Sequence, residues 1–519
     1  MRGTASSKSS PRSSSAAAGV FLALLVFGAL AAWWVFSRGY TLYWGDAEAH
    51  LYSARRIVDS RTPGYEQIGT VWLPLPHVLM LPFSSNDTLW RTGIAGAIPS
   101  VVAFAVAGAG LFALVRLLFA SGVAAACAVA LFALNPNVLY VSSIPMTESI
   151  LLAALMWTLY FAARFEGTRS TWSAAASGFC AAAACLTRYE GWFLLPFLSL
   201  LFLVRGGIRP ALTFSLIAGA APLYWLAHNQ YLYSNALDFY NGPYSPMAIQ
   251  GGRPYPGKGD IATAGRYYFE ALDHCAGASL LWIGLAGLAA ALWKRAWAVV
   301  ALLASIPAFY VVNVWGGASP IFVPTLWPGT YYNTRYAIPT LPLLILGAAS
   351  IVALVPERFR KAVAGAIVVA ALIPWLAYPN PNNWITWKES EVNSVARRAW
   401  TGKAAAFIAG HYRKGDGILI TAGDPFGIVR EAGLTLRDTL HVGNGPHAHA
   451  ALMRPDLFLW EKWVIGISAD PVSSAMMKDM TTARRYKLVR TLHEKHGPVI
   501  EIYQRIDDNP IHKSARREE

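Results

Sequence analysis

The chain is poor in charge and in cysteine. Only 14% of its 519 residues are Asp, Glu, Lys or Arg, whereas 55% are hydrophobic, and the mean hydropathy is +0.38. This balance excludes an ordinary soluble globular protein. The four cysteines have no spacing typical of a disulfide framework or of a thiolate metal site, so neither is expected to organise the fold.

Several recognition and catalytic motifs are also lacking. The sequence has no internal repeat, no glycine-rich motif that cradles phosphate, and no Ser-His-Asp or Cys-His arrangement. Acidic residues are fewer than basic ones, 29 against 43, which gives a net charge of +14. Because the basic residues are dispersed among loops and accompany no recognition motif, we expect no nucleic-acid partner.

Long apolar runs, by contrast, recur along the first three quarters of the chain. A membrane span needs roughly 17–25 predominantly apolar residues. On this basis we read eleven candidate spans, near 16–37, 93–119, 121–141, 147–163, 171–187, 190–204, 210–231, 278–293, 296–315, 337–355 and 362–378. The sequence therefore predicts a polytopic α-helical membrane protein with about eleven transmembrane helices.

The basic residues of the short turns predict the orientation. Cytoplasmic loops carry an excess of Lys and Arg, and a cytoplasmic N-terminus places every short basic turn on that side. These turns contain Arg164 and Arg169, Arg205 and Arg209, Lys294 and Arg295, and Arg358, Arg360 and Lys361. An odd span count then puts the C-terminus outside. We expect a multi-pass protein of a bacterial inner membrane, with its C-terminus in the periplasm.

The domain organisation follows from this topology. Residues 1–15 are Ser-rich and are expected to form a disordered cytoplasmic tail. Residues 16–378 form the transmembrane domain, with long outer loops at 38–92, 232–277 and 316–336. Residues 379–519 have a helical pattern near 388–412 and strand-like runs at 417–421, 463–467 and 499–503, which predict a small extracytoplasmic α/β domain.

The first outer loop contains two carboxylates just beyond the first span. A charged side chain costs about 2.5–3.5 kcal/mol at the bilayer centre, so acidic residues beside hydrocarbon usually persist for a role. Asp46 to Ser60 has the spacing of an amphipathic helix lying in the interface. Residues 71–83 are apolar but short and contain three prolines, so they are expected to enter the membrane edge without crossing it.

The spacing of Asp46 and Glu48 restricts what they can do together. Two positions apart, their carboxylates share a side in an extended segment but diverge by roughly 200° in a helix. Joint metal binding therefore requires a non-helical backbone. In a helix Asp46 instead shares a face with His50, and the structural alternative is that Asp46 only caps the helix.

Further ionisable groups fall on the same predicted side of the membrane. Glu148 opens a span, Arg188 and Glu190 lie in one turn, and Arg335 precedes another span. Each has an ordinary alternative explanation, namely a helix cap, a local ion pair or an anchor to headgroups. Their common side is what favours a shared functional site.

Four short motifs resemble the membrane glycosyltransferases of the GT-C superfamily, in particular protein O-mannosyltransferases and lipid A aminoarabinose transferases. They are Gly45–Leu51, Pro145–Ser149, Thr187–Gly191 and Asn333–Tyr336. The resemblance covers residues 16–378 and not the tail. It implies transfer of a sugar from a polyprenyl-phosphate donor, on the outer side, to a hydroxyl of a glycan, lipid or protein acceptor.

The resemblance also implies roles for residues. Asp46 occupies the place of the catalytic base, and single displacement predicts inversion at the anomeric carbon. The expected substrate-binding residues are Glu48, His50, Glu148, Arg188, Glu190, Tyr331 and Arg335. Asp46 and Glu48 are a candidate pair for a divalent metal, Mg or Mn. The family's usual acidic pairs are replaced here by Asp-Ala-Glu, so no cofactor is certain.

Two other classes remain open from the sequence. A secondary transporter or a flippase for lipid-linked sugars would place its ionisable groups near the bilayer midplane, in broken helices of related halves. Here the charges lie at one rim and no halves are visible, which disfavours transport. A non-catalytic protein that binds lipid-linked sugars is the second alternative, and it predicts that Asp46 is dispensable.

Overall fold

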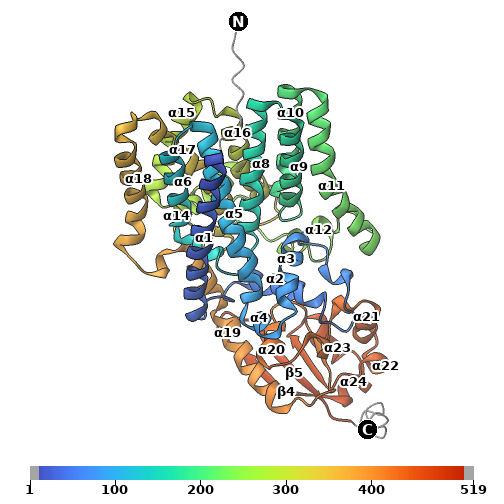
Figure 1. Cartoon of the computed structure of the whole chain (residues 1–519). Coiled ribbons are helices and arrows are strands. Elements are labelled where there is room, and N and C mark those ends of the chain that lie inside the picture. Colours follow the sequence, from blue (N-terminus) through green and yellow to red (C-terminus); the bar gives the residue numbers. More distant parts are fainter. Residues whose placement is uncertain (1–10, 508–519) are drawn as a thin grey trace. The chain divides into compact units, whose positions relative to one another are not determined.

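The computed structural model describes residues 11–507, and these fall into two compact units (Figure 1). Unit 1 comprises Met1–Thr41, Thr70–Leu79 and Gly96–Val392. Unit 2 comprises Leu42–Gly69, Met80–Ala95 and Asn393–Glu519. The second unit is therefore not the predicted domain 379–519 alone, because it includes two stretches of the first outer loop.

Unit 1 is helical and apolar. Seven of its helical segments are long and apolar enough to cross a membrane: Ser15–Ser37 of α1 (Pro11–Ser37), α5 (Ile94–Phe119), α8 (Glu148–Thr168), α11 (Ile208–Tyr233), α16 (Trp297–Trp315), Thr334–Leu354 formed by η2 (Thr334–Thr340) and α17 (Leu341–Leu354), and α18 (Glu357–Ala377). Helices α14 (Ile261–Ala276) and α15 (Ala278–Trp293) meet the criteria only as one pair bent by 110°. A polytopic α-helical membrane protein is thus confirmed.

The predicted count of eleven spans is not confirmed, since the described residues contain seven candidate spans, or eight with the bent pair. Three predicted spans fall on α6 (Gly122–Ala133), α9 (Thr171–Cys185) and α10 (Glu190–Gly206), which have 12, 15 and 17 residues. The predicted segment 121–141 is divided between α6 and α7 (Pro136–Val141), whereas 171–187 and 190–204 nearly coincide with α9 and α10.

The start of the first helix differs from expectation, whereas the short apolar stretch of the first loop does not. Helix α1 begins at Pro11, so the last five residues of the predicted disordered tail 1–15 are helical, while residues 1–10 lie outside the described part. Residues 71–83 fall mainly on α3 (Leu75–Ser84), which has 10 residues and is too short to cross. The other elements of unit 1 are α7 (Pro136–Val141), α12 (Asp238–Asn241), α13 (Pro246–Gln250), η3 (Pro381–Asn383) and the first part of α19 (Ile385–His411).

Close backbone contact holds part of unit 1 together. A Cβ on Gly287 of α15 would lie 2.1 Å from the carbonyl oxygen of Gly347 in α17, so only glycine fits there. The Ser350 hydroxyl donates to the Gly287 carbonyl oxygen at 2.7 Å. Small residues that let backbones approach replace hydrophobic burial as the packing force between helices in lipid.

Unit 2 is built on a five-stranded mixed sheet with the order β2-β1-β3-β5-β4. Its strands are β1 (Ile418–Ile420), β2 (Thr439–Leu440), β3 (Trp463–Ile467), β4 (Tyr486–His493) and β5 (Val499–Arg505). β1 is parallel to both β2 and β3, whereas β5 is antiparallel to β3 and β4. The predicted C-terminal sheet is therefore confirmed, and its three predicted strand runs fall on β1, β3 and β5.

Helices and turns cover this sheet and include part of the first loop. They are α2 (Gly45–Arg56), η1 (Tyr65–Ile68), α4 (Asp87–Thr92), α20 (Phe426–Glu431), η4 (Leu436–Asp438), η5 (Val442–Asn444), α21 (Pro446–Met453), α22 (Pro455–Phe458), α23 (Pro471–Ala475) and α24 (Met480–Arg485). Leu51 and Tyr52 of α2 are buried in one core with Trp400 and Phe426. The predicted helix in the first loop is present, but both of its sides pack against protein.

Candidate functional site

Asp46, Glu48 and His50 all lie on α2 in unit 2. Asp46 and Glu48 are in the first turn of this helix, where negative charge is favoured by the exposed backbone N–H groups. The helix cap is Trp44, so Asp46 is not the capping residue. Glu48 and His50 are each only 5% exposed, whereas Asp46 is half-buried. Asp46 and His50 share a helix face, and Glu48 points elsewhere.

Glu48 is clamped between two arginines of the C-terminal part of unit 2. Arg397 of α19 donates through Nη1 to Glu48 Oε2, and Arg430 of α20 donates through Nη2 to Oε1 at 2.8 Å. The Tyr52 hydroxyl also donates to Oε1, at 3.0 Å. All four groups are largely buried. Glu48 therefore fixes α2 to the α/β part of unit 2.

We expect Glu48→Ala to destabilise unit 2 by about 3–5 kcal/mol, because removing one partner of a buried ion pair leaves the other charges without compensation. The measurements are the denaturation midpoint of the purified protein and, separately, the rate of limited proteolysis at sites C-terminal to residue 393. Glu431→Gln is the matched control, since Glu431 also pairs with Arg430 but its side chain is 37% exposed. An equal effect of the two variants would contradict the clamp.

Asp424 is a further carboxylate beside the N-terminus of α2. Its Oδ1 lies 3.7 Å from the position of a Cβ on Gly45. The surrounding protein raises the pKa of Asp424 by desolvation, and the charges of Glu48 and Asp46 add to this, while Arg397 opposes it. Three carboxylates, from two distant stretches of sequence, thus influence each other in unit 2.

The residues present do not fit a metal held jointly by Asp46 and Glu48. The backbone of 45–56 is helical, so the two carboxylates diverge. Both Glu48 oxygens already accept hydrogen bonds from guanidinium groups, whose positive charge opposes a cation. Within residues 11–507 no group of three or more His, Cys, Asp or Glu side chains is placed to hold a metal ion.

Unit 1 brings together four of the other predicted site residues. Glu148 Oε1 accepts from Arg188 Nη1 at 3.1 Å and from Arg335 Nε at 3.0 Å. Arg188 Nε donates to Glu190 Oε1 at 2.7 Å. Glu148, Glu190 and Arg335 are 0%, 4% and 5% exposed. The expected meeting of Glu148, Arg188, Glu190 and Arg335 therefore exists as a buried cluster.

Aromatic residues complete this buried cluster. The Tyr310 hydroxyl donates to Glu190 Oε1, and Arg188 Nη2 donates to the Tyr310 oxygen at 3.2 Å. The guanidinium carbons of Arg188 and Arg335 lie 5.5 and 5.4 Å from the ring centre of Tyr336, within the range of cation–π attraction. Tyr331 is half-buried and packs against the apolar core of unit 1.

One oxygen of the cluster has no partner within the protein. Glu148 Oε2 is buried and accepts no hydrogen bond from the described residues. Buried polar atoms are nearly always satisfied, so this oxygen calls for a donor from an ordered water or from a bound molecule, such as a sugar hydroxyl.

Glu389 of α19 positions Arg335 and was not predicted from the sequence. Its carboxylate accepts from the backbone N–H of Asn333 at 2.6 Å and of Thr334 at 2.9 Å. Asn333 has φ of +56°, so this turn holds the residue in a left-handed conformation. Burial raises the pKa of Glu389 to about 7, although the Arg335 charge and these hydrogen bonds act in the opposite direction.

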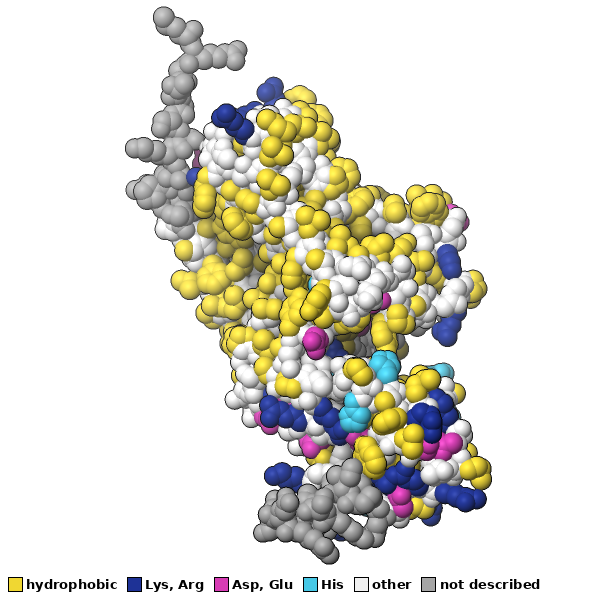
Figure 2. All heavy atoms as spheres, turned by 90° about the vertical axis from the view of Figure 1, so that its right-hand side faces the viewer, with side chains coloured by type: hydrophobic (Ala, Val, Ile, Leu, Met, Phe, Trp, Pro, Cys, Tyr) yellow, Lys and Arg dark blue, Asp and Glu magenta, His cyan; other side chains and the backbone are white. Residues whose placement is uncertain are grey.

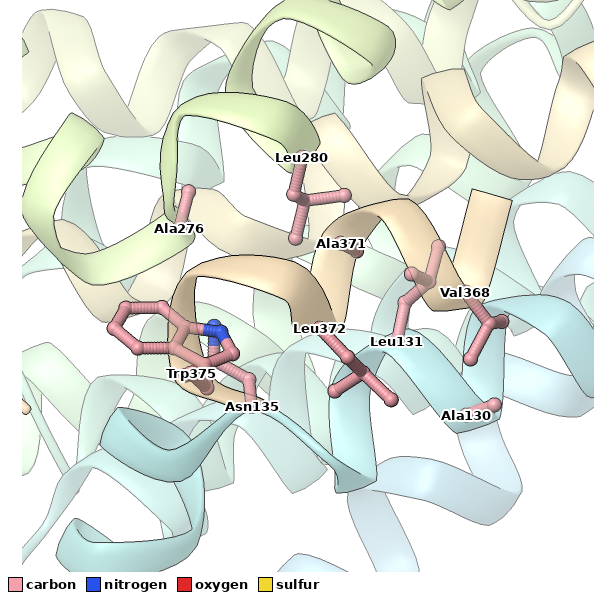
Figure 3. A pocket seen from close by; sticks show the side chains of 9 residues that line it. All are labelled: Ala130, Leu131, Asn135, Ala276, Leu280, Val368, Ala371, Leu372 and Trp375. Atoms are coloured by element: carbon pink, nitrogen blue, oxygen red, sulfur yellow. The ribbon is translucent and has the colours of Figure 1, made fainter. Parts of the chain in front are cut away.

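A hollow between helices of unit 1 is too small for a substrate. Figure 3 shows apolar side chains of α6, of the α14–α15 bend and of α18 turned toward it, with Asn135 as its polar member. The cavity measures about 10 Å³, which is room for one water at most. The Asn135 amide donates to the Cys275 carbonyl oxygen at 2.9 Å. The hollow is therefore a packing defect, and its polar lining residue is already hydrogen-bonded.

The fold and the clustered charges define a polytopic membrane protein similar to GT-C membrane glycosyltransferases, and the comparisons confirm this resemblance. The model of the family described as dolichyl-phosphate-mannose-protein mannosyltransferase matches residues 90–225. This stretch contains Glu148, Arg188 and Glu190 but neither Asp46 nor Arg335. No curated protein sequence matches the chain.

Two solved structures share the fold over nearly the whole chain. One is ArnT from Cupriavidus metallidurans bound to undecaprenyl phosphate, with 13% identity, a TM-score of 0.56, and coverage of 93% of this chain and 97% of that one. The other is the same protein in the apo state, with 14% identity, a TM-score of 0.54, and coverage of 94% and 98%. At this identity the likeness is one of fold.

Proposed function

We propose that this protein is an integral membrane glycosyltransferase that moves a sugar from a polyprenyl-phosphate donor to an acceptor hydroxyl. The observation that carries the proposal is the buried cluster of Glu148, Arg188 and Arg335, with its unpartnered carboxylate oxygen. Glu148 and Arg188 lie within the stretch that matches the mannosyltransferase family. The fold shared with a protein crystallised with undecaprenyl phosphate supports the same class of donor.

The chemistry needs one base and a place for negative charge. The acceptor oxygen attacks the anomeric carbon while Asp46 takes the hydroxyl proton, and the bond from that carbon to the phosphate oxygen breaks. The polyprenyl phosphate leaves as a stabilised anion, so no general acid is required. Arg335, with Arg188 beside it, offers preorganised donors to this phosphate as its charge develops. A single displacement inverts the anomeric configuration.

The buried cluster is better suited to directional binding of the phosphate and the sugar than to neutralising the charge of the phosphate. Glu148 and Glu190 together balance the charges of Arg188 and Arg335, so the cluster is close to neutral when both acids are ionised. Its effect on a phosphate then comes from oriented N–H groups, because guanidinium forks bind phosphate oxygens directionally. Glu148 Oε2 is the group that accepts from a sugar hydroxyl.

The chain stretches that make up unit 2 support the proposed orientation in the membrane. Residues 42–69 follow the first candidate span and residues 393–507 follow the last, yet both belong to one folded unit joined by the Glu48 clamp. They must lie on the same side of the membrane, so the total number of crossings is odd. With the basic turns in the cytoplasm, unit 2 and both chain stretches lie in the periplasm of an inner membrane.

The test is donor turnover by the purified protein in lipid nanodiscs. With labelled polyprenyl-phosphate sugars and an envelope extract as acceptor, we expect released polyprenyl phosphate in step with labelled, anomerically inverted product. A chelator in the same assay is expected to leave the rate unchanged, since Asp46 and Glu48 do not fit a shared metal. Donor binding without turnover would instead support a non-catalytic binding protein, and donor translocation into vesicles without sugar release would support a flippase.

A further inference from the structure

A basic hollow lies at the opposite end of the helices of unit 1 from the turn that carries Arg188. It measures about 720 Å³ and is lined by Arg169, Thr171, Arg205, Gly206, Ile208, Arg209 and Pro210. These residues come from the α8–α9 turn and from the α10–α11 turn, which the sequence analysis places in the cytoplasm. None of them belongs to the site proposed above.

Three arginines give this hollow its positive charge. Arg169 donates through Nη1 to the backbone oxygen of Arg205, which ties the two turns together. Arg205 pairs with Glu166 at 3.2 Å, and both side chains are partly exposed. Arg209 has no hydrogen-bond or ion-pair partner for its guanidinium among residues 11–507 and is exposed. One acidic group therefore offsets three basic ones.

Two helices begin at the same hollow. α9 starts at Thr171 and α11 starts at Ile208, and neither has a side-chain hydrogen-bonded cap in the described structure. The first N–H groups of a helix have no partner within it, and the helix dipole adds a partial positive charge there. Backbone donors and arginine side chains thus converge on one concave surface, which is the chemistry of an anion site.

The rim of the hollow is apolar and exposed, which favours a lipid over a free anion as the ligand. Trp172, Val204 and Ile208 are 70%, 71% and 60% exposed. Figure 2 shows basic side chains at the upper end of a face that is otherwise largely apolar along the helices. α11 is a candidate span, and α9 and α10 pack beside it. We expect the exposed apolar side chains of these helices to face acyl chains, so that a headgroup of the same lipid layer lies at the height of the arginines.

We propose that this hollow binds the phosphate headgroup of an anionic membrane lipid, with the acyl chains lying along the exposed apolar surfaces of α10 and α11. The volume is within the range of ordinary small-ligand sites. Basic pockets between transmembrane helices on the cytoplasmic side are a recurring form of headgroup recognition. The inference does not rest on the proposed glycosyltransferase reaction.

The experiment is lipid binding by the full-length protein, measured by native mass spectrometry and by thermal shift. Delipidated protein is titrated with phosphatidylglycerol and, separately, with zwitterionic phosphatidylcholine. We expect phosphatidylglycerol alone to bind specifically and to raise the unfolding temperature. Arg209→Gln should weaken this binding about fivefold, and Arg169→Gln with Arg209→Gln about 25-fold, at roughly one such factor for each charge removed near a surface.

Arg358→Gln is the matched control, because Arg358 is an exposed arginine in another turn predicted to be cytoplasmic and does not line the hollow. Its binding of phosphatidylglycerol should equal that of the parent protein. Because the Arg209 guanidinium has no hydrogen bond or ion pair among residues 11–507, we expect the Arg209→Gln protein to fold. Equal affinity for the two lipids, equal loss in the control, or displacement of the lipid by millimolar inorganic phosphate would each overturn the lipid site.

Discussion

Asp46→Asn is expected to lower sugar transfer by roughly 10²–10⁴-fold, which is the usual contribution of a positioned general base. Asparagine has nearly the same shape as aspartate, but its amide cannot take the acceptor proton. The rate is followed as polyprenyl phosphate released from a labelled polyprenyl-phosphate sugar by protein in nanodiscs. Since the change affects the chemical step, we expect kcat to fall while donor binding persists.

The control for this variant is Glu66→Gln in the same loop, because Glu66 is exposed and lies outside the candidate site. It should transfer sugar at the parent rate. The denaturation midpoint of Asp46→Asn should also stay close to that of the parent, since asparagine keeps the shape of aspartate and the Glu48 clamp on α2 is unchanged. Undiminished kcat in a folded Asp46→Asn protein would remove Asp46 from the role of base.

The two carboxylates of the first loop show what sequence reasoning can and cannot separate. The helical spacing after Asp46 is legible in the sequence, and α2 is where it was expected. The direction of each carboxylate follows from helix geometry once the helix is given. What fixes Glu48 is not local, because Arg397 and Arg430 are 349 and 382 positions away in the chain.

The charged residues of the buried cluster in unit 1 were more predictable than Glu389 and Tyr310, which hold them in place. Glu148, Arg188, Glu190 and Arg335 stand out because charge is rare beside apolar runs, and a common side of the membrane brought them together correctly. Glu389 and Tyr310 gave no such signal. Glu389 lies on α19 among other charged and polar residues, and Tyr310 lies in an apolar span, where an aromatic residue is unremarkable.

The bounds of the predicted spans could not all be obtained from hydropathy, because helix ends are set by local backbone geometry. Helix α6 ends before Asn135, whose side chain accepts from the N–H groups of the next short helix, α7. The apolar run continues through both elements, so the sequence predicts one long span at 121–141. Tertiary packing decides which apolar residues belong to a crossing helix.

Arg335→Gln is expected to reduce kcat by roughly 10²–10³-fold, the usual cost of removing one preorganised donor from a site where negative charge develops. Glutamine keeps part of the side-chain volume but cannot present the two-pronged guanidinium to a departing phosphate. Arg335→Lys should recover only part of the rate, since it restores the charge without the planar fork. Both variants are compared in the donor-release assay, with kcat and KM determined separately.

A structural role alone would give a different pattern, because Arg335 also pairs with buried Glu148. Arg335→Lys keeps a positive charge beside Glu148, so it should retain most of the thermal stability lost in Arg335→Gln but should not regain the parent kcat. Arg253→Gln, at an exposed arginine of a different loop, should behave as the parent in both measurements. If the Arg335→Lys protein had both the stability and the kcat of the parent, Arg335 would act by holding Glu148 and not by receiving the phosphate.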